Sequence, residues 1–74
     1  MKTYVTSDLY LAAYLKSKGI KLIGQKRDSN RVAFIFQERK DREELIKDFF
    51  SDGLVNVTTF KNAVQDLKTI VFNT

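Results

Sequence analysis

The clearest pattern in the sequence is a two-residue alternation of side-chain character across residues 20–37, IKLIGQKRDSNRVAFIFQ. Successive side chains of a strand point to opposite faces of a sheet, so this period indicates β-structure. β-branched and aromatic residues fill both halves, and Asp28-Ser29-Asn30 between them is typical of a turn. The pattern predicts a β-hairpin over residues 20–37. Its core face is expected to hold Leu22, Val32, Phe34 and Phe36.

The two faces also predict the register of the hairpin. Directly opposed residues of antiparallel strands share a face, so the apolar sets meet only when even-numbered residues oppose even-numbered ones. This parity leaves a three-residue loop, 28–30, with Asn30 in the left-handed conformation. A two-residue loop of Ser29 and Asn30 would mismatch the faces, and we reject it. The expected pairs are Arg27 with Arg31, Ile23 with Ile35, and Gly24 with Phe34.

Two further elements are expected before the hairpin. Residues 2–5 are short and β-prone, and a third strand there would support a hairpin that is marginal alone. Residues 7–18 have a helical pattern that is apolar around most of its circumference, and they end at Gly19, a normal residue after a helix. Thr6 or Ser7 is the expected cap, with Asp8 in the first turn.

Two helices are expected after the hairpin. Residues 42–51 carry an apolar stripe, and Asp41 with Glu44 three residues later has the pattern of a capping box. Residues 57–72 place an apolar residue about every third or fourth position, with Asn56 as the expected cap and Thr58 as its competitor. The order β-α-β-β-α-α predicts an α+β fold, in which a small antiparallel sheet packs against three helices.

The length of 74 residues, beginning with Met, predicts one small domain over residues 1–74 and a complete gene product. A chain this short has a thin core, which a partner or a homodimer would remedy. There is no apolar run long enough to span a membrane and no signal-like segment, so we expect a cytoplasmic protein without a membrane partner.

The composition lacks the side chains of most catalytic and metal sites. The sequence has no His and no Cys, which excludes imidazole bases, thiol nucleophiles and the usual zinc sites. Its three glycines are scattered, so no phosphate-binding loop is formed. Asp41, Glu44 and Asp48 share a helix face that could hold Mg²⁺, but capping and solvation explain these residues better. We expect no catalytic residue, no metal site and no cofactor, and therefore not an enzyme.

Two sets of residues are candidates for binding. The formal charge of +4 is concentrated in the first half of the chain. Two arginines directly opposed on a hairpin are unfavourable, and such a broken rule suggests function, here contact with nucleic acid. Tyrosines spaced i, i+4 and an outward isoleucine pair suggest a protein interface instead. The nucleic-acid candidates are Lys21, Lys26, Arg27 and Arg31, and the protein-interface candidates are Tyr10, Tyr14, Ile23 and Ile35.

The segment TSDLYLAAYLKSKGIKLIG, residues 6–24, resembles the opening block of a family of short proteins from phages and prophage-like regions. The likeness continues through residues 31–36, 45–50 and 60–73, and that family is catalogued as a domain of unknown function. The resemblance implies a stand-alone accessory protein of phage or mobile DNA and transfers no site residue. Small size and missing catalytic groups favour a regulatory protein that contacts another protein, such as a host protein. The alternatives are a nucleic-acid-binding regulator and, remotely, a Mg²⁺-dependent enzyme.

Overall fold

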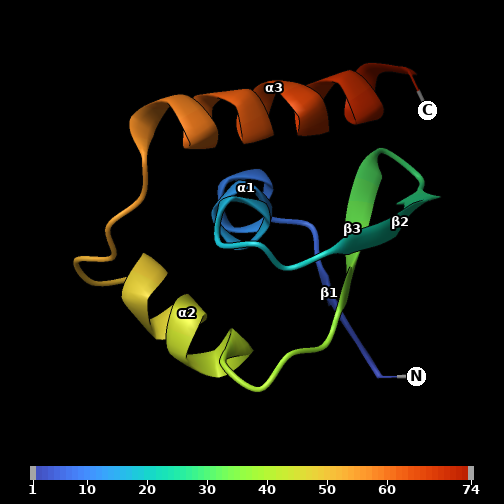
Figure 1. The fold of residues 1–74 in the computed structure, drawn as a ribbon. Coiled ribbons are helices and arrows are strands. Elements are labelled where there is room, and N and C mark those ends of the chain that lie inside the picture. The colour runs from blue at the N-terminus through green and yellow to red at the C-terminus, as the bar shows by residue number, and fades with distance from the viewer. Residues whose placement is uncertain (1, 74) are drawn as a thin grey trace.

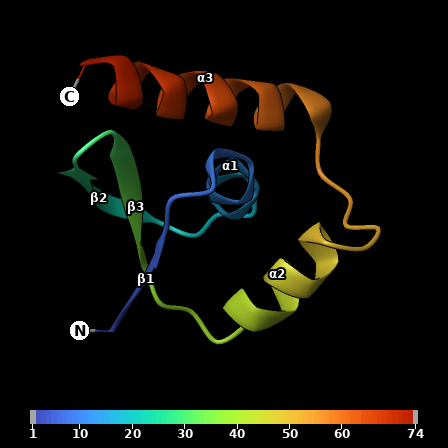
Figure 2. The same cartoon turned by 180° about the vertical axis from the view of Figure 1, so that it is seen from behind.

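The computed structural model describes residues 2–73, and its elements follow the predicted order β-α-β-β-α-α. It confirms the α+β class, with one three-stranded antiparallel sheet and three helices among the described residues. Figures 1 and 2 show α3 and α2 on opposite sides of α1, with the sheet beside α1 and α3. The elements are β1 (Thr3–Thr6), α1 (Leu9–Ser17), β2 (Leu22–Asp28), β3 (Arg31–Gln37), α2 (Arg42–Phe49) and α3 (Val57–Asn73).

Helix α1 is the centre of the molecule, because five consecutive residues, 11–15, are buried. Five residues cover more than one helical turn, so the middle of α1 meets protein on every side. The core joins this helix to the inner face of the sheet and to α3. Its largest fully buried side chains are Leu15, Phe34, Phe36 and Leu67.

The ends of α1 are set by local chemistry. Asp8 is the cap, since its carboxylate accepts the backbone N–H groups of Tyr10 and Leu11, each at 3.0 Å. The expectation of a cap at Thr6 or Ser7 is wrong, because Thr6 is the last residue of β1. At the other end Gly19 has φ +91°, and the N–H of Ile20 reaches back to the Leu15 carbonyl oxygen.

Of the caps predicted for the other two helices, one is confirmed and one is wrong. The cap of α3 at Asn56 is confirmed, since its side-chain oxygen accepts the N–H of Thr59 at 3.0 Å. Asp41 occupies the cap position of α2, but its side chain makes no capping hydrogen bond, so the capping box with Glu44 is wrong. The Asp41 carboxylate instead accepts two hydrogen bonds from Arg39, at 2.6 and 2.9 Å.

The predicted third strand is present, and it pairs with β3 rather than with β2. The predicted register of the hairpin is wrong near the turn. Arg31 lies opposite Asp28, and a two-residue loop of Ser29 and Asn30 connects the strands. The left-handed residue is Ser29, with φ +57°, rather than Asn30.

A β-bulge explains how this two-residue loop is compatible with one apolar face. Between Leu22 and Gly24 the register shifts, so Ile23 is an extra residue without a partner in the ladder. The extra residue reverses the parity, and Leu22 therefore lies opposite Phe36 on the core face, as the apolar pattern requires. The pairs of Ile23 with Ile35 and of Gly24 with Phe34 are not formed, because Ile35 lies opposite Gly24 and Phe34 opposite Gln25.

Candidate functional site

The four basic candidates of the hairpin do not form one surface. Arg27 lies opposite the buried Val32, so it is on the side of the sheet that the helices cover. Its guanidinium donates to the carbonyl oxygen of Val71 in the last turn of α3, at 2.6 Å. Arg31 and Lys26 are on the outer face, while Lys21 precedes β2. The opposition of Arg27 and Arg31, on which the nucleic-acid interpretation depended, is absent.

The two tyrosines also separate. Tyr10 is 55% exposed, whereas Tyr14 is only 3% exposed beneath α2, with its ring 5.5 Å from that of Phe49. Among the described residues its hydroxyl has no hydrogen-bond partner. A side chain added at Gly53 would overlap with this hydroxyl. Tyr14 is therefore a core residue in this structure, and Tyr10 alone of the pair is on the surface.

The isoleucines of the expected outward pair have separate neighbours. Ile35 lies in the middle of the sheet between Val5 and Gly24, and it is half-buried. Ile23 is 42% exposed at the bulge. No helix of the described chain packs on this outer face in Figures 1 and 2.

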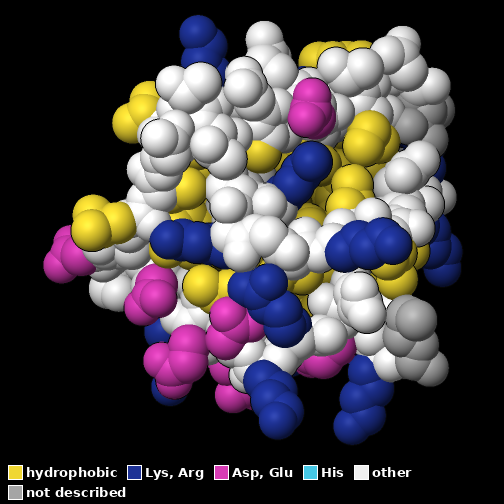
Figure 3. Space-filling view, viewed as in Figure 1, with side chains coloured by type: hydrophobic (Ala, Val, Ile, Leu, Met, Phe, Trp, Pro, Cys, Tyr) yellow, Lys and Arg dark blue, Asp and Glu magenta, His cyan; other side chains and the backbone are white. Residues whose placement is uncertain are grey.

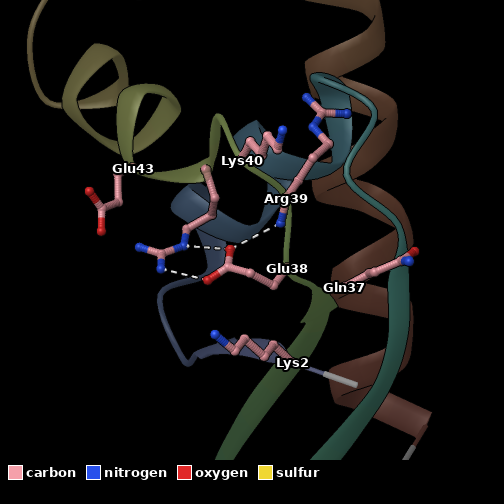
Figure 4. Close-up of a pocket in the computed structure, with 7 residues that line it drawn as sticks. Lys2, Gln37, Glu38, Arg39, Lys40 and Glu43 are labelled. Atoms are coloured by element: carbon pink, nitrogen blue, oxygen red, sulfur yellow. Dashed lines mark hydrogen bonds and ion pairs between the residues drawn. The ribbon is translucent and has the colours of Figure 1, made fainter.

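A hollow of the surface lies beside the connection from β3 to α2. It has a volume of about 460 Å³ and is lined by Lys2, Arg42 and residues 37–40 and 43. A second hollow of about 170 Å³ shares residues 37–39 with it and extends to residues 19–21. We call the two together the 37–43 groove. Figure 4 shows Lys2 and Lys40 on either side of Glu38 in this groove.

Two bidentate ion pairs fix the shape of the 37–43 groove. Arg42 binds the carboxylate of Glu38 at 2.8 and 3.0 Å, and its guanidinium lies 4.4 Å from the centre of the Tyr4 ring. Arg39 binds Asp41 and also donates to the carbonyl oxygen of Lys18 at the end of α1, at 3.1 Å. The guanidinium groups therefore hold the connection against β1 and α1.

These pairs change the acidity of their members. The hydrogen bonds from the Arg42 side chain and the Arg39 backbone hold the pKa of Glu38 below its ordinary value. The hydrogen bond from the Arg39 side chain lowers the pKa of Asp41. The side-chain hydrogen bond to Asp41 raises the pKa of Arg39, and the one to Glu38 raises the pKa of Arg42. Both carboxylates are thus charged at neutral pH and neutralise the two arginines.

The lysines around the 37–43 groove are not neutralised in this way. Lys2, Lys21 and Lys40 line it, and within residues 2–73 none of their ammonium groups forms an ion pair or a hydrogen bond. Glu43 is the one lining carboxylate outside the two ion pairs. The groove therefore retains an excess of positive charge. In Figure 3 basic side chains lie across the middle of the face shown, and basic and acidic side chains are mixed below them.

An apolar surface that the sequence pattern did not predict extends from the end of α2 to the first residue of α3. Phe50, Leu54 and Val57 are 71, 83 and 80% exposed, although they lie within eight residues of one another. We call these three residues the apolar connection. Phe50 and Val57 fall within residues 42–51 and 57–72, which were expected to carry apolar stripes. The one available signal was the Ser-Asp-Gly sequence, residues 51–53, which interrupts the helical period.

The apolar connection is held in place rather than loose. The N–H groups of Ser51 and Gly53 both donate to the Asp48 carbonyl oxygen, and the Lys18 ammonium donates to the carbonyl oxygen of Leu54. The ring of Phe50 stands edge-on to that of Phe49, with centroids 5.0 Å apart. An apolar surface that is already ordered loses little entropy when a partner covers it.

Helix α2, which precedes the apolar connection, is itself weakly packed. None of its eight residues is buried, and Leu45, Ile46 and Phe49 are only half-buried against the core. The carboxylates of this helix do not collect into a metal site, since no group of three potential ligands lies together among residues 2–73. In that same range, no helix is long and apolar enough to cross a membrane.

The comparisons with known proteins support a family of unknown function. No curated protein and no solved structure matches the chain. One family model matches residues 1–73, which is nearly the whole chain. The protein therefore belongs to the family described as "Domain of unknown function (DUF5659)".

Proposed function

We propose that this protein is a small, non-enzymatic regulatory module that acts by binding another protein through its apolar connection. The observation that carries the proposal is the exposure of Phe50, Leu54 and Val57 on an ordered segment. Contiguous exposed apolar patches mark interaction sites, and the proposal takes these three side chains to form such a patch. Phe50 and Leu54 supply the apolar area, and the half-buried α2 beneath them would gain packing when a partner docks.

The accessory role in phage or mobile DNA, and with it a host protein as the partner, comes from the family resemblance of residues 6–24. The exposed Tyr10 of the same segment is a further contact candidate. A second copy of the chain is another candidate partner, because the core of a 74-residue protein is small. The proposal requires one of these partners to cover the apolar connection.

Affinity capture with paired variants tests this proposal. We expect wild-type protein to retain a partner from an extract of its source cells, and the variant Phe50→Ser/Leu54→Ser to lose it. The matched control is Phe72→Ser, which removes an equally exposed apolar side chain (82%) at the end of α3. Equal retention by all three proteins, with unchanged circular dichroism, would show that the apolar connection is not the interface. Sedimentation of the same proteins identifies a homodimer.

Nucleic-acid binding is the second candidate function. It is supported by Lys21, Lys26 and Arg31, which form no ion pair or side-chain hydrogen bond within residues 2–73. Arg27 no longer supports it, because its guanidinium is bonded to α3. Titration of labelled DNA and RNA at several salt concentrations tests this candidate, and the variant Lys26→Gln/Arg31→Gln should reduce the salt dependence of binding.

A further inference from the structure

The 37–43 groove and the apolar connection are adjacent. Arg39, on the wall of the groove, donates to the carbonyl oxygen of Lys18. The ammonium of the same lysine donates to the carbonyl oxygen of Leu54. Lys18 therefore contacts both the wall of the groove and the backbone of the apolar connection, so one partner that spans Lys18 can cover both.

The charge of the groove indicates what such a partner carries. Five cations and two carboxylates line it, and the ion pairs of Arg39 with Asp41 and of Arg42 with Glu38 are already complete. The groove thus offers three lysine ammonium groups against the single carboxylate of Glu43. The three are Lys2, Lys21 and Lys40.

We propose that the 37–43 groove binds an acidic polypeptide segment of the protein partner, with carboxylates paired to Lys2, Lys21 and Lys40. This inference rests on the proposed function and adds the chemistry of the partner to it. Side chains of an extended peptide alternate in direction, so carboxylates can meet the lysines while intervening apolar residues reach toward Leu54. Charge complementarity of this kind gives an interface specificity and fast association.

The groove fits a peptide better than a nucleic acid. The carboxylate of Glu43, which lies outside the two ion pairs, would repel a backbone that carries a charge on every nucleotide, whereas a peptide can place a neutral residue there. Single strands are also usually held by aromatic stacking, whereas no aromatic residue is among the described residues that line the groove, and the Tyr4 ring is covered by Arg42. Spaced carboxylates avoid both difficulties.

Nuclear magnetic resonance titration of the ¹⁵N-labelled full chain tests this inference with defined probes. The first probe is a twelve-residue peptide of alternating Glu and Ser, the second replaces every other Ser by Leu, and the third is a dT12 oligonucleotide. We expect the first peptide to shift the amide signals of residues 19–21 and 37–43, and to bind more weakly as salt is raised. The second should bind more tightly and also shift residues 50–57.

Two charge variants provide the matched comparison. Lys21→Glu/Lys40→Glu and Lys61→Glu/Lys68→Glu each change the formal charge from +4 to 0, and Lys61 and Lys68 are exposed on α3, away from the groove. The first variant should lose roughly tenfold in affinity for both peptides, and the second should bind them like wild type. Equal losses in the two variants, no binding of either peptide by wild type, or tighter binding of dT12 at the same amides would overturn the inference.

A third variant separates the inference from the proposed function. Phe50→Ser/Leu54→Ser should bind the Glu-Ser peptide like wild type and lose the extra affinity for the peptide that contains Leu. If the Leu-containing peptide has no advantage, the apolar connection fails as an interface while the groove stands. If both peptides bind without effect of the Lys21 and Lys40 substitutions, the groove fails while the apolar connection stands.

Discussion

The guanidinium of Arg27, next to the hairpin turn, donates a hydrogen bond to the carbonyl oxygen of Val71 in the last turn of α3. In Figure 1 the tip of the hairpin lies beside the C-terminal end of this helix. The carbonyl groups of a last helical turn lack partners within the helix, and their dipoles favour a positive charge. Arg27 therefore joins two elements that are 44 residues apart in the sequence.

Replacement of Arg27 by Gln should lower the free energy of unfolding by about 0.3–1 kcal/mol, the usual value of a cation at an exposed helix C-terminus. Urea unfolding followed by circular dichroism measures this change. Arg31→Gln is the matched control, because Arg31 has no side-chain hydrogen bond or ion pair within residues 2–73. If the two variants were equally stable, the contact with Val71 would contribute nothing.

Replacement of Gly53 by Ala should be destabilising by about 1–3 kcal/mol, because the new methyl group would overlap with the Tyr14 hydroxyl and the Asp48 carbonyl group. Gly24→Ala is the control. No atom lies within 4 Å of the position its methyl group would take, so the change should stay within about 0.5 kcal/mol. Thermal and urea unfolding of the two variants give the comparison.

The Tyr14 hydroxyl offers a second test of the same contact. It is buried and has no hydrogen-bond partner among the described residues, so its desolvation is not compensated. Tyr14→Phe should therefore leave stability unchanged or raise it, and should also relieve part of the cost of Gly53→Ala in the double variant. A loss of more than about 1 kcal/mol in Tyr14→Phe would mean that the hydroxyl is bonded in solution.

Stability should fall in acid through the two ion pairs of the 37–43 groove. Both carboxyl pKa values are lower in the folded protein than in the unfolded chain. The stabilisation is therefore complete above the ordinary carboxyl range of about pH 3.9–4.3 and is lost as the pH falls through the folded values. Unfolding midpoints of wild type and of Glu38→Gln/Asp41→Asn should converge with decreasing pH. A constant difference between them would contradict this linkage.

Helix α2 should open more readily than α1. It has no buried residue, whereas the middle of α1 is buried on every side. Local opening is easiest where few apolar contacts must break. Amide hydrogen exchange of residues 45–49 should therefore be faster than that of residues 13–17. Binding of the partner should slow exchange in α2, and equal protection of both helices in the free protein would show that α2 is an integral part of the core.

Features that depend on residues close together in the chain could be predicted from the sequence. The alternation over residues 20–37 located both arms of the hairpin, and the position of Gly19 located the end of α1. The cap at Asn56 was recognisable because a side-chain amide oxygen can satisfy the first free N–H groups of a helix within its own turn. Such features depend on neighbours a few residues away, and the sequence states those directly.

Features that depend on contacts between distant segments could not be predicted from the sequence. The bulge at Ile23 allows a two-residue turn to coexist with one apolar face. The alternation alone is equally compatible with a three-residue turn and no bulge. Tyr10 and Tyr14 have the same helical spacing, but only the placement of α2 buries one and exposes the other. Arg27 was expected on the solvent face, because the sequence does not show that the C-terminal end of α3 lies within hydrogen-bonding distance of its guanidinium.

By itself, then, the sequence determined the α+β class, the order of the elements and the absence of His and Cys, because these follow from composition and from short-range periodicity. Only the tertiary structure decided which charged and aromatic side chains are bonded or buried and which are exposed. Long-range packing bonded Arg27 to α3 and paired Arg39 and Arg42 with carboxylates. It left Lys2, Lys21 and Lys40 without ion pairs within residues 2–73, and it left the apolar connection exposed. The candidate site arises from residues that are unremarkable in the sequence, because what folding leaves unpaired is a property of the assembled chain.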